Sequence, residues 1–551
     1  MVVEGLFTHR FAPRQGLALA GRCVRVCPER LRARLRPGPV ACRTDNRAHH
    51  RRQGTAPARH PTFTDENPMA PLDILIMAAG KGTRMQSRRP KVLHRLAGRP
   101  LLQHVLDTGA QLQPRSAVVI TGHGAIEVEA ACAQPTGAGA TFDPQFDLKF
   151  VRQEPQLGTG HAVQQAVPVL AGDGTVLVLS GDVPLTQPDT LRALVAASEG
   201  VAGGALALLT VTLPDPTGYG RIVRDASGAV QGIVEHKDAT DAQRAITEVY
   251  SGIMAVPAQH LTGWLARLTN DNAQREYYLT DIVAMAVQAG VPVVGHCIAD
   301  ALQVEGINSP LQLAAVERAH QLRQARALME QGVRLADPAR FDLRDDVRSG
   351  ARGQLVCGQD VEIDVGCIFT GPVVLGEGVQ IGAHCCIANA RIAAGTVIHP
   401  YTHIDGETLG ASVGEGALIG PFARLRPGAA LGRDVHIGNF VEIKNSTLAD
   451  GAKANHLAYL GDATVGERVN YGAGSITANY DGANKHRTVI EADVHVGSNC
   501  VLVAPVTIGA GATVGGGSTI TKDVPPGALG VARGKQASIA NWQRPTKAGR
   551  S

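Results

Sequence analysis

The sequence predicts a Rossmann-like α/β domain, a single linking helix and then a left-handed parallel β-helix. Three observations predict this order. From Leu72 to about Pro310, short apolar runs alternate with helical stretches, which is typical of an α/β domain with a mostly parallel sheet. Residues 311–331 contain neither glycine nor proline. Beyond residue 332, apolar residues recur with a period of six, a repeat that predicts a parallel β-helix.

The first domain, 69–310, contains apolar runs at 74–77, 117–120 and 176–179 that we interpret as buried strands, and helical stretches at 101–113 and 161–169. Ligands of such domains bind beyond the carboxyl ends of the strands. A glycine-containing loop follows the first run, and the Gly181-Asp182 pair follows the third. We therefore expect this loop and this pair at the same ligand-binding edge.

Residues 311–331 are rich in Ala, Leu, Gln, Glu and Arg and predict one helix of about six turns that links the two halves. In the last part, 332–551, each hexapeptide would form one strand and one turn, and three would form a coil with the apolar residue inside. About ten coils spaced at ~4.8 Å would give a prism roughly 45 to 50 Å long. The apolar residues in register are Ile363, Phe369, Leu375, Ile381 and Ile387, then Val413, Ile419, Leu425, Leu431, Ile437 and Ile443, then Val496, Leu502, Ile508, Val514 and Ile520.

The register of the repeat breaks between Ile443 and Val496. Breaks in a solenoid mark inserted loops, which usually lie on the functional face. Polar and aromatic residues with chemical potential gather in this interval: His456, Tyr459, Asn470, Asn479, Tyr480 and Lys485.

The composition restricts the class of protein. Aromatic residues make up only 4% of the chain while glycine reaches 64 residues, which suits tightly turned β structure. A net charge of +4 gives no reason to expect a nucleic-acid partner. The ten cysteines lack paired Cys-x-x-Cys spacing, so we interpret them as reduced thiols of a cytoplasmic protein. No apolar run approaches the ~18 residues of a membrane span, so we expect no membrane insertion.

The first 68 residues differ from the rest, with thirteen arginines, no lysine and no serine. Their apolar stretch, 16–20, is too short for a signal peptide. The simplest interpretation is that translation starts at Met69 and that 1–68 is a non-native extension; the alternative is a disordered basic arm. In either case we expect this segment to be dispensable.

The loop after the first strand is the most informative motif of the chain. It contains Gly80 and Gly82, and the cations Lys81, Arg84 and Lys91 lie in it or just after it. Glycines let backbone N–H groups approach an anion closely, and the cations add charge, so the loop resembles a phosphate cradle. It is not a Walker loop, because one residue, not four, separates the two glycines.

Four later strings narrow the assignment: Gln-Leu-Gly-Thr-Gly-His at 156–161, Ser-Gly-Asp-Val-Pro at 180–184, Pro-Thr-Gly-Tyr-Gly-Arg at 216–221 and Val-Glu-His-Lys-Asp at 234–238. Together with the loop they resemble the bacterial bifunctional N-acetylglucosamine-1-phosphate uridylyltransferases / glucosamine-1-phosphate acetyltransferases. The resemblance runs from about Met69 to the C-terminus. It implies a nucleotidyltransferase (pyrophosphorylase) fold at 69–310 and an acetyltransferase at 332–551.

The resemblance also implies roles for individual residues of the first domain. Asp182 and Asn308, the latter in Val304-Glu-Gly-Ile-Asn308, match two Mg²⁺ ligands, and Mg²⁺ prefers a few protein oxygens completed by phosphates and water. Residues matched to UTP and the UDP-sugar are Ala78, Ala79, Gly80, Arg84, Lys91, Gln153, Gly158, Thr159, Gly220, Glu235 and Asn308. One departure is Tyr250, which stands where many relatives have a sugar-contacting asparagine. A tyrosine hydroxyl has a different reach, so this contact differs here.

In the second domain the resemblance implies acetyl transfer. The ammonium of glucosamine 1-phosphate must lose a proton before it attacks a thioester, and His456 matches the proposed base. Arg426 and Lys444 match residues that hold the sugar phosphate, and Tyr459 and Asn470 match other sugar contacts. Residues matched to acetyl-CoA contacts are Ala473, Asn479, Tyr480, Ser498, Gly516, where relatives often have alanine, and Arg533.

The leading hypothesis is therefore a homotrimeric bifunctional enzyme that makes UDP-N-acetylglucosamine for bacterial cell-wall and outer-envelope polymers from glucosamine 1-phosphate, acetyl-CoA and UTP. A second hypothesis keeps only uridylyl transfer and treats the β-helix as a trimerisation scaffold. A third is a regulatory translation-factor subunit, which can lack catalytic residues that this chain retains. A metal site of the carbonic-anhydrase type is a weaker alternative, with candidate ligands His384, His399, His403, His436, His456 and His495.

Overall fold

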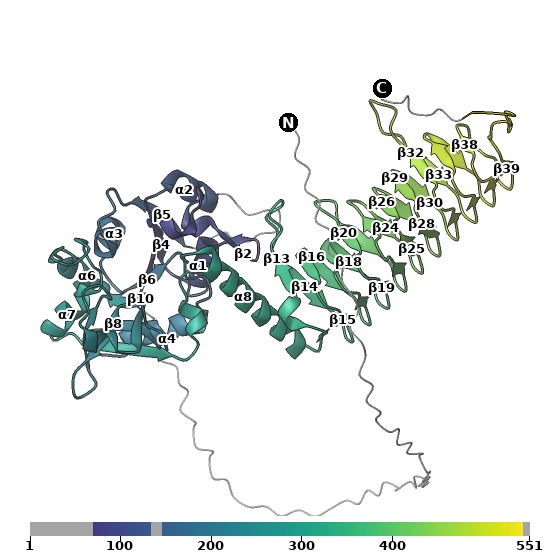
Figure 1. Cartoon of the computed structure of the whole chain (residues 1–551). Helices are drawn as coiled ribbons and strands as arrows, with labels where there is room; N and C mark the ends of the chain where they lie inside the picture. Colours follow the sequence, from purple (N-terminus) through teal and green to yellow (C-terminus); the bar gives the residue numbers. More distant parts are fainter. Residues whose placement is uncertain (1–69, 134–145, 544–551) are drawn as a thin grey trace, which may run out of the picture. The chain divides into compact units, whose positions relative to one another are not determined.

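The computed structural model describes residues 70–133 and 146–543, and these form an α/β domain, a long helix and a stack of short parallel strands (Figure 1). The predicted fold class is confirmed. The basic segment 1–68 and the end of the chain beyond residue 543 lie outside the described residues.

The α/β domain is built on a nine-stranded sheet whose main path runs β11–β7–β10–β6–β1–β4–β5. Strand β10 is antiparallel to both of its neighbours and the other pairs on this path are parallel, so the sheet is mostly parallel as predicted. The hairpin of β8 and β9 joins the sheet through β10. The strands are β1 (Leu72–Met77), β4 (Ser116–Thr121), β5 (Asp147–Arg152), β6 (Thr175–Ser180), β7 (Leu206–Thr212), β8 (Arg221–Arg224), β9 (Val230–Val234), β10 (Glu248–Pro257) and β11 (Val293–Ile298); β2 (Arg95–Leu96) and β3 (Arg99–Pro100) form a separate pair.

Helices cover both faces of this sheet because alternate residues of each strand point to opposite sides. Ile74 and Ile76 of β1 pack in one cluster with Leu102 of α1, whereas Leu75 packs in another with Val163 of α3. The predicted helix at 101–113 ends three residues early, at Ala110, and the one at 161–169 starts at Thr159 and ends in a 3₁₀ turn. The helices are α1 (Leu101–Ala110), α2 (Ala125–Ala133), α3 (Thr159–Ala166), α4 (Pro188–Glu199), α5 (Asp241–Arg244), α6 (Ala258–Leu265), α7 (Asp281–Gln288) and α8 (Pro310–Glu330), with 3₁₀ turns at Thr83–Met85, Lys91–Leu93, Val167–Val169, Ala301–Val304 and Pro338–Arg340.

The predicted linking helix is α8. It begins at Pro310 because Ser309 caps it: the Ser309 hydroxyl accepts a hydrogen bond from the Gln312 backbone N–H at 3.3 Å, and proline suits the first helical position. Val316 of α8 is buried against Leu96 and Leu101 of the first domain. The linking helix is thus packed against the α/β domain along part of its length.

After α8 the chain coils into a three-faced parallel β-helix (Figure 1). One face is an 11-stranded sheet, so the prediction of about ten coils is confirmed. Its strands are β12 (Arg334–Leu335), β15 (Glu362–Ile363), β17 (Gln380–Ile381), β19 (Val397–Ile398), β22 (Leu418–Ile419), β25 (His436–Asn439), β28 (Lys453–His456), β31 (Asn470–Tyr471), β34 (His495–Val496), β37 (Thr513–Val514) and β39 (Leu529–Gly530).

The other two faces form one continuous 17-stranded sheet. Its strands are β13 (Asp342–Arg344), β14 (Gln354–Cys357), β16 (Ile368–Leu375), β18 (Cys386–Ile392), β20 (His403–Asp405), β21 (Ala411–Val413), β23 (Arg424–Leu425), β24 (Ala430–Leu431), β26 (Glu442–Lys444), β27 (Thr447–Leu448), β29 (Tyr459–Gly461), β30 (Ala463–Val465), β32 (Ile476–Ala478), β33 (Thr488–Ile490), β35 (Val501–Val503), β36 (Val506–Ile508) and β38 (Thr519–Ile520).

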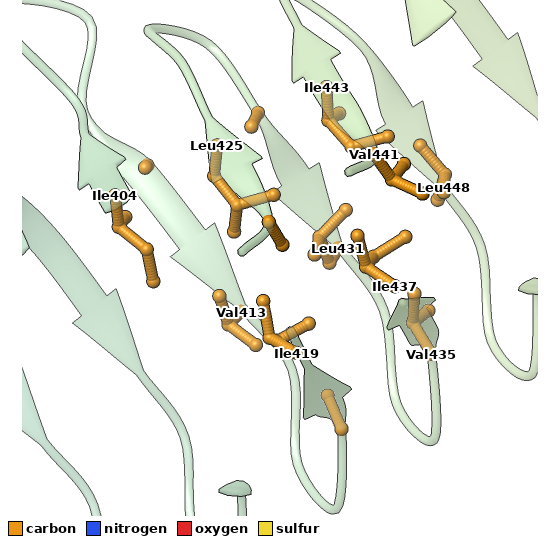
Figure 2. Close-up of a cluster of buried hydrophobic side chains, with 14 of the residues drawn as sticks. Ile404, Val413, Ile419, Leu425, Leu431, Val435, Ile437, Val441, Ile443 and Leu448 are labelled. Carbon is orange, nitrogen blue, oxygen red and sulfur yellow. The ribbon is translucent and has the colours of Figure 1, made fainter. Parts of the chain in front are cut away.

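The apolar residue of each hexapeptide points into the prism, as the period of six predicts. Figure 2 shows Ile419 and Ile437 from one face beside Leu425 and Ile443 from the next, all fully buried. Every residue of the three predicted series is buried. This continuous apolar interior holds the coils together, because neighbouring coils bury surface that a single coil would leave exposed.

The break in the register has two causes, whereas the sequence predicted only inserted loops. Only one segment, 479–487 between β32 and β33, is an insertion. At two corners the spacing between successive inward-facing residues is instead five rather than six, from Ile443 to Leu448 and from Leu460 to Val465. A further loop at 406–410, between β20 and β21, was not predicted.

Two histidines pack between α1 and α8 and should make the stability of the protein pH-dependent. The rings of His104 and His320 lie 5.6 Å apart, and burial, helped by His104 and Arg323, lowers the pKa of His320 to about 4. The unfolded chain, with a histidine pKa near 6.5, takes up this proton first, so stability is present above about pH 6.5 and is lost as the pH falls towards 4.

We expect the wild-type protein to lose ~2 kcal/mol of unfolding free energy from His320 alone between pH 7.5 and pH 5. His320→Gln, which carries no titrating proton, should lose correspondingly less. Urea unfolding of both proteins at the two pH values measures the difference. An identical pH dependence in the two proteins would contradict the assignment.

Two candidate active sites

The first candidate site lies at the carboxyl ends of β1 and β6, where Lys91, Asp182 and Asn308 converge. The Lys91 ammonium nitrogen lies 2.5 Å from Asp182 Oδ2 and 3.1 Å from Asn308 Oδ1. Lys91 and Asp182 are both largely buried, with 15% and 16% of their side chains exposed. Three residues that are far apart in the sequence therefore meet as one charged cluster, at the edge where the strand pattern predicts ligands.

Backbone contacts hold this cluster together. The Ile307 N–H donates to the Asp182 carbonyl oxygen at 3.0 Å, which fixes the 306–308 segment against the end of β6. The Asn308 side-chain nitrogen donates to the Gly306 carbonyl oxygen at 3.3 Å. This bond orients the amide so that its oxygen faces Lys91. Two protein oxygens thus point at a single cation, which is the donor set that a small divalent metal such as Mg²⁺ would use.

The glycine loop lies beside this cluster. Ala78 and Ala79, both buried, follow β1 directly, and the Ala78 N–H donates to the Ile120 carbonyl oxygen at 2.9 Å. Gly82 has a φ of +60°, and a side chain there would meet the Cβ of Lys91 at 2.7 Å. Glycine is therefore required where the loop passes the stem of Lys91.

Two cations of the loop remain free. Lys81 and Arg84 are exposed, and neither forms an ion pair in the described part of the chain. Nothing lies within 4 Å of the Cβ that a residue at Gly80 would carry, so the loop is open at this point. Free cations beside an open loop fit an incoming polyphosphate.

The residues predicted to contact the nucleobase of UTP lie together where α3 begins. Gln153 is buried, and its amide nitrogen donates to the Gly158 carbonyl oxygen at 2.9 Å. In the described residues no donor reaches its Oε1, which can therefore accept from a ligand N–H. The Thr159 hydroxyl accepts from the Leu279 N–H at 3.0 Å, and a side chain at Gly158 would meet the Tyr277 carbonyl oxygen at 2.7 Å. These contacts place the start of α3 firmly beside Gln153.

Gly220, Glu235 and Tyr250 also lie together, as predicted for the sugar contacts. A side chain at Gly220 would come within 3.6 Å of Glu235 Oε1, and the Tyr250 N–H donates to the Gly220 carbonyl oxygen at 2.9 Å. Burial raises the pKa of Glu235, and nearby acids add to this effect. The Thr280 hydroxyl, a contact that the sequence did not reveal, donates to Glu235 at 3.0 Å.

The Tyr250 hydroxyl is buried and has no hydrogen-bond partner among the described residues. Burial, and then the charge of Glu235, raise the pKa of this phenol, so it stays protonated. A buried hydroxyl without a partner carries a desolvation cost of about 1–3 kcal/mol. Tyr250 is therefore a position where the protein alone leaves a donor unsatisfied.

The second candidate site follows one edge of the β-helix, between the 11-stranded sheet and the face that begins with β13. Four predicted residues occupy the same corner position in four successive coils: His456, Ala473, Ser498 and Gly516. The Arg533 side chain reaches this edge and lies 3.8 Å from the positions that side chains at Gly515 and Gly517 would take. A Cβ at Gly516 would lie 3.4 Å from the Ser498 carbonyl oxygen, so an alanine would also fit at this position.

In each coil, the residue that directly follows this corner position changes from a bulky to a smaller side chain along the prism. Each residue there has a φ near +60°, and the aromatic rings of successive coils stack with centroids 5.1–5.4 Å apart. At Leu457, next to His456, the stack ends and small residues follow: Gly474, Asn499 and Gly517. We call the exposed series His384, Tyr401, Phe422, Phe440 and Leu457 the ridge. The side chains at the corner are therefore bulky before His456 and small beyond it. The small side chains leave room where a long ligand such as coenzyme A could lie.

The Asn439 side chain orients His456. The His456 Nδ1 lies 3.1 Å from Asn439 Oδ1, and the ring is exposed at the end of β28. An amide oxygen accepts a hydrogen bond from Nδ1–H, so in the neutral ring Nε2 carries the lone pair and can act as a base. Sequence reasoning did not single out Asn439, because only the stacking of coils brings it next to a residue 17 positions later.

A group of cations lies at the far edge of the same face. Arg426 donates to Glu442 at 2.8 Å, and the ammonium groups of Lys444 and Lys485 lie close enough to act on each other electrostatically. This interaction with Lys485 lowers the pKa of Lys444, and burial and Arg426 lower it further. Lys485 lies in the inserted segment and was not assigned a role from the sequence. Cations held this close to one another favour binding of an anion such as a phosphate.

The other predicted residues flank these two edges. Tyr459 lies on the face between them, with its hydroxyl over Gly461, whereas Asn470 lies on the neighbouring 11-stranded face. Asn479 is buried and donates to Asp462 at 2.5 Å, so its side-chain nitrogen is committed to the fold. Tyr480 is exposed in the inserted segment and donates to the Gly482 carbonyl oxygen at 2.6 Å.

No group of three or more His, Cys, Asp or Glu side chains that could hold a metal occurs within the ranges 70–133 and 146–543. The same ranges contain no helix long and apolar enough to cross a membrane.

Comparison with known proteins finds a transferase family for each of the two domains. Residues 74–246 match the family model of the MobA-like NTP transferase domain, and residues 410–445 and 487–522 match the bacterial transferase hexapeptide (six repeats). The chain is similar to "Bifunctional protein GlmU" of Acidovorax sp. (strain JS42), with 80% identity over 479 residues that cover 87% of this chain and 99% of the relative. It is 72% identical over 484 residues to the protein of that name from Polaromonas sp. (strain JS666 / ATCC BAA-500), covering 87% and 98% of the two chains.

A relative of lower identity is also matched over nearly its full length: the protein of that name from Bordetella parapertussis is 54% identical over 480 residues, covering 86% of this chain and 99% of the relative. The resemblance that the motifs indicate is confirmed. The chain belongs to the family of the bifunctional protein GlmU and is an enzyme with a nucleotidyltransferase domain followed by an acyltransferase domain of hexapeptide repeats.

Proposed function

We propose that the chain makes UDP-N-acetylglucosamine by two consecutive reactions. Its second domain acetylates glucosamine 1-phosphate with acetyl-CoA, and its first domain then transfers UMP from UTP to the N-acetylglucosamine 1-phosphate, releasing pyrophosphate. The observation that supports this is the presence of two separate sets of chemical groups, around Asp182 and around His456, on domains that match two transferase families. We place the reactions in the bacterial cytoplasm, where their product supplies cell-wall and outer-envelope polymers.

In the uridylyl site we assign Asp182 and Asn308 as the Mg²⁺ ligands. When bound, Mg²⁺ would neutralise charge on the phosphates of UTP. Arg84 and Lys91 would pair with phosphate oxygens, and backbone N–H groups at Ala78, Ala79 and Gly80 would face the nucleotide. Gln153, with Gly158 and Thr159, would read the uracil. Positioning and charge neutralisation supply most of the catalysis in phosphoryl-type transfers.

We assign Gly220, Glu235 and Tyr250 to the sugar. Gly220 leaves room beside the Glu235 carboxylate, which can accept from a sugar hydroxyl. The unpartnered Tyr250 hydroxyl, enclosed by protein in the free chain, would donate to the substrate after its side chain turns towards the sugar. In this way the tyrosine would take the part of the asparagine common in relatives.

Tyr250→Phe tests this assignment, because it removes only the hydroxyl. We expect the KM for N-acetylglucosamine 1-phosphate to rise roughly 3- to 10-fold, the effect of one lost neutral hydrogen bond, while the KM for UTP stays the same. Steady-state kinetics and thermal melting should be measured together. If Phe raises the melting temperature and leaves both KM values unchanged, the hydroxyl is merely a buried unsatisfied group.

In the acetyl site we assign His456 as the base that takes a proton from the substrate ammonium. The cations Arg426 and Lys444 would hold the phosphate at one edge of the face, and Tyr459 and Asn470 would contact the sugar. Acetyl-CoA would lie along the part of the corner that has small side chains, against Ala473, Ser498, Gly516 and Arg533, with Asn479 and Tyr480 nearby. The amine would then face the thioester beside His456.

We further propose that the protein is a homotrimer in which the ridge is covered by a neighbouring copy. Tyr401, Phe422, Phe440 and Leu457 of the ridge are 48–62% exposed in the single chain. Monomeric proteins seldom leave a continuous apolar patch uncovered. Because the ridge ends beside His456, a neighbour that covers it would also border the acetyl site.

Replacing both Phe422 and Phe440 by asparagine should weaken the trimer and reduce acetyl transfer, while uridylyl transfer persists. Asparagine tolerates the left-handed backbone that both positions adopt, so the fold should survive. Leu409→Asn, at an exposed apolar residue outside the ridge, is the matched control. Light scattering at several concentrations measures the mass. A wild-type monomer active in acetyl transfer would contradict the trimer, and an intact trimer in the double variant would contradict the role of the ridge.

The second candidate function is uridylyl transfer alone, with the β-helix as a scaffold. The two functions differ in one assay: thiol release from acetyl-CoA in the presence of glucosamine 1-phosphate, run beside UTP-dependent pyrophosphate release. The bifunctional proposal expects both signals. Absence of thiol release from trimeric protein would leave only the uridylyl reaction.

A further inference from the structure

Lys91 lies where a metal ion would bind. Its ammonium nitrogen is within hydrogen-bonding distance of the carboxylate of Asp182 and the amide oxygen of Asn308, and these are the two oxygens that we assign to Mg²⁺. An ammonium and a divalent cation cannot share this position, since their charges repel and the same lone pairs serve both. We propose that Lys91 is a latch that competes with the divalent metal and keeps the metal affinity of the nucleotide-free enzyme low. The inference rests on the proposed metal site and deepens it.

Hydrogen bonds around Lys91 hold the two oxygens that it contacts in fixed positions. The Asn308 amide is already oriented by Gly306, so its oxygen stays aimed at the ammonium. The Ile307 N–H ties the segment to the Asp182 carbonyl oxygen, so the two oxygens remain close to each other when the lysine leaves. The latch therefore occupies a site that needs no further assembly to receive a metal.

The glycine loop provides the means of release. A side chain at Gly82 would meet the Cβ of Lys91 at 2.7 Å, so the loop passes the base of this lysine and a polyphosphate in the loop would lie within reach of its ammonium. Phosphate oxygens would offer Lys91 new partners of the same charge as Asp182, and the freed carboxylate would then take the metal that arrives with the nucleotide. Metal and triphosphate would thus enter together, and a free divalent cation would bind poorly.

Removal of the latch should raise the affinity for metal alone. In Lys91→Met, Asp182 no longer faces a cation, and we expect Mn²⁺ to bind roughly tenfold more tightly than in the wild type, since an adjacent opposite charge biases such a site by one or more powers of ten. Mn²⁺ without nucleotide is the probe, and electron paramagnetic resonance of free Mn²⁺ gives the dissociation constant. The full-length protein is used throughout.

Three variants sharpen the measurement. Lys81→Met removes an exposed cation of the same loop and should change Mn²⁺ affinity less than threefold. Lys91→Arg keeps a cation at the latch and should bind Mn²⁺ as weakly as the wild type. Asp182→Ala should lose binding at this site, and the double variant Lys91→Met with Asp182→Ala should lose the gain. Circular dichroism melting of each variant confirms that it is folded.

The outcomes separate the latch from the metal site. Tighter Mn²⁺ binding in Lys91→Met, but not in Lys81→Met or Lys91→Arg, supports the latch. Unchanged or weaker binding in Lys91→Met, with Asp182→Ala still losing Mn²⁺, overturns the latch and leaves the metal site standing. Equal Mn²⁺ binding in Asp182→Ala and wild type overturns the proposed metal site itself.

Discussion

Asp182→Ala should reduce UTP-dependent pyrophosphate release roughly 10²–10³-fold, the loss typical of removing one group that stabilises transition-state charge. Asp182 follows β6 directly, and its carboxylate is one of only two protein oxygens that meet the Lys91 ammonium among the described residues. Without it, a metal would retain a single neutral amide ligand from the protein. Lys91 would also lose its anionic partner and remain near the loop as an unpaired charge.

Acetyl transfer should continue in this variant, because its candidate residues all lie after α8. Thiol release from acetyl-CoA with glucosamine 1-phosphate therefore serves as the internal control for folding. Asp182→Asn is the matched variant, since it keeps the shape and removes the charge, and it should lose nearly as much activity. If pyrophosphate release stays within a few-fold of wild type, Asp182 does not hold the metal. If both activities disappear in folded trimeric protein, the two sites are not independent.

The repeat was the most predictable part of the fold, for a physical reason. A residue that must point into the prism in every coil leaves a period of six that is visible in one dimension, and every member of the three series is buried. The alternation of strands and helices likewise predicted the sheet. The antiparallel direction of β10 was not predictable, because a buried strand has the same apolar pattern in either direction.

Contacts between distant segments lay beyond the sequence. The resemblance indicated Asp182 and Asn308 as a pair of Mg²⁺ ligands and Lys91 as a UTP contact, but nothing in the motifs shows that the lysine bridges the other two. Asn439 reaches His456 only because one coil stacks on the next. The ridge was also missed, since Phe422 and Phe440 adopt a left-handed backbone that bulky residues rarely take. Its aromatic residues fall outside the inward-facing positions that the period of six identifies.

His456→Ala should reduce acetyl transfer roughly 10²–10⁴-fold, the usual contribution of a positioned general base. The reacting ammonium must lose its proton before its lone pair can attack the thioester. His456 is suited to take that proton, because Asn439 at 3.1 Å orients Nδ1 and leaves Nε2 available. The substitution removes the acceptor but leaves the corner positions Ala473, Ser498 and Gly516, so acetyl-CoA should still bind and its KM should change little.

Asn439→Ala provides the matched test of this orientation. It keeps the imidazole but removes its hydrogen-bond partner, so we expect a smaller loss in kcat than for His456→Ala and little change in the KM for acetyl-CoA. Uridylyl transfer to supplied N-acetylglucosamine 1-phosphate should be nearly unchanged in both variants, which verifies the fold. An acetylation rate within a few-fold of wild type in His456→Ala would show that another group takes the proton. A loss in Asn439→Ala as large as that in His456→Ala would mean that the imidazole acts only when Asn439 holds it in place.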